Sequence, residues 1–192
     1  MSTRNDYTVE EWELIRRAPA ESVIAVEQAS PSGFWASRRE RKAAVRSFTD
    51  SIARTTGLEL VDAIVAAREE EGPLLETLRA SGESFVEVAV QAARGARRAL
   101  EAKATLPERE AYVNAILAAC EEVALASGEG KGGGKTSRAE ALLLTRLAGA
   151  LGRSAYEPPD SDWIGTGGVQ DMVADSAVLG GIREIPPKPR EG

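Results

Sequence analysis

The chain contains no histidine and a single cysteine among its 192 residues. Histidine is the commonest general base and the commonest transition-metal ligand, so any catalysis would have to use carboxylates, lysines or hydroxyls. The lone Cys120 excludes an internal disulfide and a cysteine-rich zinc site. It lies in the apolar run Ala115-Ile-Leu-Ala-Ala-Cys120, which is typical of a buried packing residue. We therefore expect a protein that is not an enzyme.

Long apolar runs are also missing. No stretch reaches the roughly 18 to 20 apolar residues of a membrane-spanning helix, and the first residues lack the apolar core of a secretory signal. The sequence therefore predicts a cytoplasmic protein. Its net charge of −6 argues against general attraction to nucleic acid or anionic lipid. The partner that we expect is another protein, with no cofactor.

A recurring pattern marks the starts of helices. Ser or Thr is followed three residues later by Glu at Thr8/Glu11, Ser37/Glu40, Ser84/Glu87, Thr105/Glu108 and Ser137/Glu140. In this pattern, called a capping box, the hydroxyl accepts from a backbone N–H of the first turn while the glutamate accepts from the N–H of the cap residue. Together with helical apolar spacing, it predicts an all-α fold with helices at 8–18, 20–30, 38–56, 58–71, 73–81, 84–103, 107–127 and 138–152.

The composition changes after Gly152. Five prolines and the run Gly165-Thr-Gly-Gly168 are typical of a linker or tail. The sequence therefore predicts a helical domain at 5–153 and a largely irregular C-terminal arm at 154–192. A sparse apolar series in the arm includes Met172, Val173, Leu179 and Ile182. The arm docks either on its own core or on a partner.

A short internal repeat suggests how the helices are organised. Val26–Gly33 and Val123–Gly130 both read Val-x-x-Ala-Ser-x-x-Gly, and a Ser-x-x-Glu helix start follows each. Two similar helix-loop-helix halves are expected to form a bundle, with the helices of 58–103 as a connector. The alternative is a chance similarity between two alanine-rich helices.

This arrangement resembles the tellurite-resistance TerB-like helical family over residues 20–56 and 112–152. In that family, loop aspartates and helix-start glutamates are implicated in binding a divalent metal. The resemblance implies Glu40 and Glu140 as ligands, with Glu129 as a partial substitute for the loop aspartate that this chain lacks. It suggests an alternative function, a stress-response protein that binds a divalent metal ion through carboxylates.

Two adjacent large aromatic residues, Phe34 and Trp35, occupy the first loop of the repeat. Both cannot easily face the core, and aromatic side chains are enriched at protein interfaces. The main hypothesis is therefore a non-enzymatic interaction or scaffold protein. Its predicted partner-binding residues are Phe34, Trp35, Met172, Val173, Leu179 and Ile182.

Overall fold

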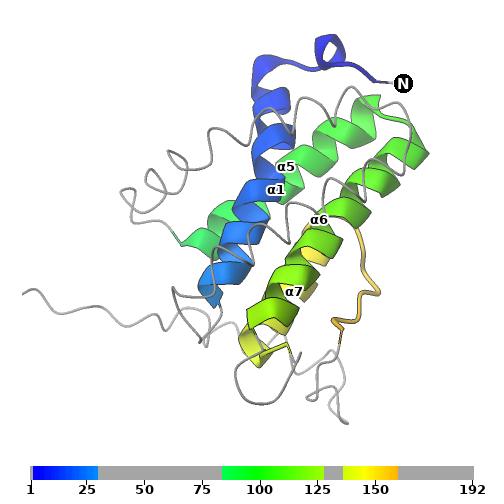
Figure 1. Ribbon diagram of the computed structural model, residues 1–192. Helices are drawn as coiled ribbons and strands as arrows, with labels where there is room; N and C mark the ends of the chain where they lie inside the picture. The colour runs from blue at the N-terminus through cyan, green and yellow to red at the C-terminus, as the bar shows by residue number, and fades with distance from the viewer. Residues whose placement is uncertain (1, 30–83, 128–135, 160–192) are drawn as a thin grey trace, which may run out of the picture. The chain divides into compact units, whose positions relative to one another are not determined.

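The computed structural model describes residues 2–29, 84–127 and 136–159, and most of these residues are helical (Figure 1). A short 3-10 helix, η1 (Arg4–Asp6), precedes four α-helices: α1 (Val9–Ala29), α5 (Phe85–Lys103), α6 (Leu106–Ser127) and α7 (Arg138–Ala150). The three described ranges contain no strand, which confirms the all-α prediction for this part of the chain. The chain divides into two compact units, Met1–Ser161 and Asp162–Gly192.

Several predicted features lie outside the described residues. They include the helices at 38–56, 58–71 and 73–81, the first copy of the repeat from Ser30 onward, and both glycine-bearing loops. The same holds for all six predicted partner-binding residues, Phe34, Trp35, Met172, Val173, Leu179 and Ile182, and for two predicted metal ligands, Glu40 and Glu129. The duplicated bundle therefore stays a prediction.

Helix α1 packs mainly against α5, with α6 and α7 completing its surroundings (Figure 1). The two helices run in opposite directions. Glu11 near the start of α1 accordingly pairs with Lys103 at the end of α5. The buried face of α5 consists largely of alanine: Ala89, Ala92, Ala93, Ala96 and Ala99. Small side chains allow two helix axes to approach closely. At Gly95 an added Cβ atom would lie 2.8 Å from Cδ1 of Leu14, so the Leu14 side chain of α1 lies against the backbone of α5.

Helix α6 is buried on more than one face. The consecutive residues Ala111–Val113 and Ala115–Leu117 are all buried, and the helix contacts α1, α5 and α7. A helix that is apolar around most of its circumference is typical of a central position in a core. Cys120 is fully buried there, and burial raises the pKa of its thiol, in agreement with the predicted packing role.

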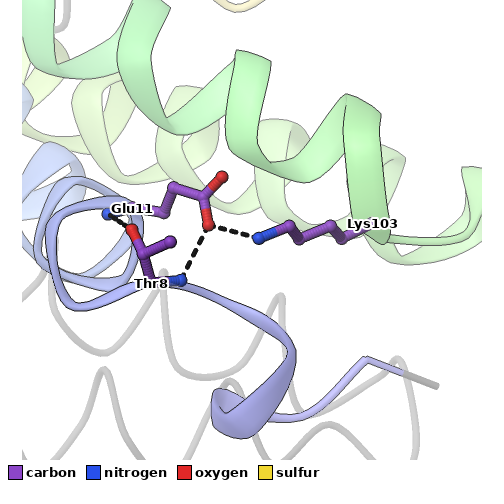
Figure 2. A network of polar contacts seen from close by, with 3 residues as sticks. All are labelled: Thr8, Glu11 and Lys103. Atoms are coloured by element: carbon purple, nitrogen blue, oxygen red, sulfur yellow. Dashed lines mark hydrogen bonds and ion pairs between the residues drawn. The ribbon is translucent and has the colours of Figure 1, made fainter.

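The capping boxes form as predicted at Thr8 and at Ser137. Glu11 Oε2 accepts from the Thr8 N–H at 2.8 Å, the Glu11 N–H donates to Thr8 Oγ1 at 3.2 Å, and Lys103 binds the same carboxylate (Figure 2). The equivalent Ser137–Glu140 distances are 2.8 and 3.3 Å. A further capping box at Thr3 and Asp6, which sequence analysis missed, starts η1.

Of the other three predicted helix starts, Ser37 lies outside the described residues, and Thr105 and Ser84 behave differently. At Thr105 the glutamate half of the pattern forms, because Glu108 Oε2 accepts from the Thr105 N–H and hydroxyl, both at 2.8 Å. Glu108 Oε1 also accepts from the Ser2 N–H at 2.7 Å, which fixes the N-terminal segment to α6. The Ser84 side chain makes no cap hydrogen bond. Its predicted partner Glu87 instead pairs with Arg146 of α7 at 2.6 Å.

The predicted division into separate helices at 8–18 and 20–30 is wrong. Helix α1 continues through Pro19. Proline has no N–H, so it cannot donate to the carbonyl of the residue four positions earlier, which is Ile15. The hydroxyl of Tyr112 donates to that carbonyl instead, at 2.7 Å, from a fully buried position on α6. A side chain 97 residues away therefore satisfies the backbone group that proline leaves unpaired.

The first residues of the predicted arm lie against α6. Tyr156 packs on the hydrophobic core, and its hydroxyl donates to Glu121 Oε1 at 2.6 Å. Nearby, Arg153 Nη2 donates to Asn114 Oδ1 at 2.6 Å. Arg153 and Tyr156 thus attach the segment that follows α7 to α6.

Replacing Tyr112 with phenylalanine should destabilise the protein by about 1 to 3 kcal/mol, because the Ile15 carbonyl then stays buried without a donor. Urea denaturation measures this loss. The variant Pro19→Ala provides the matched background, since alanine at this position has the N–H that can donate to Ile15. In the Pro19→Ala background, Tyr112→Phe should therefore lower the free energy of unfolding by less than it does in the wild-type protein. An equal loss of stability in the wild-type and Pro19→Ala backgrounds would show that the Tyr112 hydroxyl does not compensate for the N–H that proline lacks.

Candidate functional site

The described residues of α1 and α5 line an open groove. Its volume is about 770 Å³. The α1 side presents Glu10, Glu13, Leu14, Arg17 and Glu21, and the α5 side presents Ser84, Glu87, Val88, Gln91 and Ala92. Both sets follow the three- and four-residue spacing of one helical face. The groove is thus formed by two helical stripes, which we call the α1 stripe and the α5 stripe.

The two stripes combine apolar and acidic side chains. Leu14, Val88 and Ala92 supply apolar surface, and Leu14 is 37% exposed although it is a large aliphatic residue. The described lining contains four carboxylates, Glu10, Glu13, Glu21 and Glu87, and one guanidinium, Arg17. The groove is therefore apolar along part of its length and carries an excess of negative charge.

Glu21 is the most unusual of these carboxylates, because it is only 3% exposed. Arg17 Nη2 lies 2.6 Å from Glu21 Oε1, and the Arg17 side chain is 42% exposed. Burial raises the pKa of Glu21, and the charge of Arg17 opposes this shift only in part. Charged side chains are rarely fully buried unless they are paired, and perturbed carboxylates in a cleft are candidate functional residues.

The carboxylates nearer the solvent have ion-pair partners outside the groove lining. Glu13 Oε2 lies 2.7 Å from Nη2 of Arg16, and Glu87 Oε1 lies 2.6 Å from Nη2 of Arg146. Glu13 and Glu87 are 44% and 56% exposed. Exposed ion pairs contribute about 0 to 1 kcal/mol, so these carboxylates can exchange partners at little cost.

Only one of the predicted metal ligands, Glu140, lies in the described part of the chain. It occupies the third position of α7, is 1% exposed, and accepts from the Ser137 N–H. Its carboxylate thus serves as a helix cap. Within residues 2–29, 84–127 and 136–159, no three histidine, cysteine, aspartate or glutamate side chains converge as metal ligands do.

Sequence analysis did not identify the groove residues. The α1 stripe was hidden because the predicted break at residue 19 separates Glu21 from Arg17 and Leu14. The α5 stripe was interpreted only as a helix start at Ser84. One local signal is available in the sequence: Glu21 stands among the small and apolar residues Ala18, Ser22, Ile24 and Ala25. A glutamate in such a stripe indicates either a buried ion pair or a binding residue.

Comparison of the chain with protein-family models, curated proteins and solved structures found no match. The resemblance to the tellurite-resistance family thus stays a hypothesis based on the repeat and its glutamates. Within the described ranges, no helix has the length and apolar character needed to cross a bilayer.

The pKa shift of Glu21 leads to a prediction about pH. A folded-state pKa above the ordinary value of 4.5 means that folding favours the neutral side chain. The stabilisation from burying neutral Glu21 is fully present below the ordinary pKa of glutamate. It is lost as the pH rises through the folded-state pKa of Glu21. Relative to Glu21→Gln, the wild-type protein should therefore lose stability above about pH 4.5. Urea midpoints measured from pH 4 to pH 8 provide the test.

The matched control is Glu13→Gln, which removes a half-exposed carboxylate from the same stripe. Its stability difference from wild type should change much less over this pH range. A Glu21→Gln curve that stays parallel to the wild-type curve would contradict the assigned effect of burial.

Proposed function

We propose that this chain is a cytoplasmic, non-enzymatic interaction protein that binds a helical segment of another protein in the α1–α5 groove. The observation that carries the proposal is the pairing of two helical stripes around a half-exposed Leu14. The cytoplasmic assignment comes from the sequence.

A helix is the natural ligand for this type of groove. Two antiparallel helices leave a channel along their length, and an amphipathic helix fills such a channel with residues spaced three and four apart. The exposed Leu14 and the apolar Val88 and Ala92 provide the surface that the apolar face of the ligand would cover. The polar residues of both stripes would then contact the edges of the ligand.

The contact residues predicted from the sequence extend this proposal. Phe34 and Trp35 in the first loop, together with Met172, Val173, Leu179 and Ile182 in the arm, are proposed as further contacts with the partner. Their support is the sequence alone, namely the aromatic pair in a glycine-bearing loop and the sparse apolar series in a proline-rich segment.

The alternative hypothesis is a carboxylate metal site that uses Glu40, Glu129 and Glu140. No observation among the described residues favours it, because Glu140 is engaged in its helix cap. A calcium-dependent rise in melting temperature that Glu140→Gln removes would support it. Glutamine also functions in a capping box, so this variant keeps the helix start intact.

The proposed function is tested with labelled amphipathic peptides that form helices, measured by fluorescence anisotropy. The panel contains cationic, neutral and anionic polar faces, and each peptide has a scrambled control without the apolar stripe. At least one amphipathic peptide should bind more tightly than its scrambled control. Leu14→Asp should weaken that binding about tenfold or more, since burying a leucine is worth about 1.5 to 3 kcal/mol.

Leu106→Asp is the matched control for this experiment. Leu106 is also an exposed leucine, 57% exposed at the start of α6, but it does not line the groove. Its replacement should leave peptide binding unchanged. Circular dichroism should confirm that both variants keep their helices. If no amphipathic peptide binds better than its scrambled control, the proposed function is wrong.

A further inference from the structure

We infer that the helix bound by the groove is basic, with lysine or arginine on both sides of its apolar stripe. This inference rests on the proposed function and specifies the chemistry of the partner. It follows from the charged side chains of the α1 and α5 stripes. Most of them are negative, and they lie on both walls of the groove.

Acidic side chains lie on each wall. The α1 stripe contributes Glu10 and Glu13, and the α5 stripe contributes Glu87. The apolar residues Leu14, Val88 and Ala92 belong to the same two stripes. A helix whose apolar face meets these residues would bring its two flanks toward the carboxylates. Lysine or arginine on those flanks is therefore complementary, whereas glutamate or aspartate is opposed by like charge.

The carboxylates of the groove can accept new partners. The Glu13–Arg16 and Glu87–Arg146 pairs join side chains that are partly exposed and solvated. Such pairs are weak, because water screens the attraction and ordering two long side chains costs entropy. A cation brought in by a docked helix is held near the carboxylate by the rest of the interface. Binding also removes water from the groove, which strengthens each charge pair.

Glu21 adds a buried acceptor at the end of the α1 stripe. An ionised carboxylate has about four lone-pair sites, and Arg17 is its ion-pair partner among the described residues, through Oε1. The Arg17 side chain is 42% exposed, so it can rotate toward solvent. A lysine or arginine from the partner would then supply further donors to a carboxylate that is already largely removed from water.

The net charge of the chain also favours a basic ligand. A charge of −6 attracts a basic ligand at long range and repels an acidic one. The preference for a basic helix should therefore decrease with salt, because exposed charges are screened over about 10 Å at 0.1 M ionic strength.

The test compares cationic and anionic peptides that share one apolar stripe and differ only in lysine or glutamate on the flanks. Fluorescence anisotropy with the full chain should show the cationic peptide binding at least about tenfold more tightly. Raising the NaCl concentration to about 0.5 M should reduce this ratio. The charge reversal Glu10→Lys with Glu13→Lys should abolish the preference for the cationic peptide.

The matched control is Glu110→Lys with Glu122→Lys. These residues are exposed glutamates of α6 that do not line the groove, and their replacement changes the net charge by the same amount. The control variant should keep most of the preference. An equal loss in both double variants would show that only the overall charge acts, and would overturn the inference about the groove.

The results separate the two proposals. If both peptides bind equally, or the anionic one binds more tightly, the groove accepts helices but the basic partner is wrong. If neither peptide binds better than its scrambled form, the proposed function fails and this inference fails with it. A cationic preference that the Glu10 and Glu13 reversal removes and the α6 control retains supports both.

Discussion

The hydrogen bond from Tyr112 to the Ile15 carbonyl is the interaction on which the described structure depends most. Pro19 deprives that carbonyl of its ordinary donor, and a buried carbonyl without a partner favours a break in the helix. The hydroxyl from α6 removes this penalty at 2.7 Å, so α1 continues to Ala29. The α1 stripe spans the proline, with Arg17 before it and Glu21 after it. These residues share one face only because the helix continues, so the Tyr112 contact also positions the groove.

The close approach of α1 and α5 is the second constraint. The buried face of α5 consists largely of alanine, and Gly95 leaves room for Leu14, whose Cδ1 atom would lie 2.8 Å from an added Cβ atom. The Leu14 side chain remains 37% exposed and lines the groove. An exposed leucine between acidic residues is the surface that a docking helix would contact.

Local patterns in the sequence predicted the helical character of the described ranges, whereas contacts between distant residues determined the features that these patterns missed. The starts at Thr8 and Ser137 were predicted correctly because both partners of each capping box lie within four residues. The box at Ser84 failed because Glu87 pairs with Arg146, 59 residues away. The break at Pro19 was wrong for a similar reason, since Tyr112 is 97 residues from Ile15. The groove combines two helices that are far apart in the sequence, so neither stripe alone revealed it.

The roles of the glutamates explain why an acidic composition alone did not identify a site. Glu11, Glu108 and Glu140 accept backbone N–H groups at helix starts, which commits their carboxylates to the fold. Glu121 accepts from Tyr156 and holds the segment after α7. The groove differs because the paired carboxylates of Glu13 and Glu87 are 44% and 56% exposed, and because Glu21 is buried beside a half-exposed arginine. A binding partner can compete for these carboxylates without unravelling a helix start, and this physical difference distinguishes the groove from the other acidic residues.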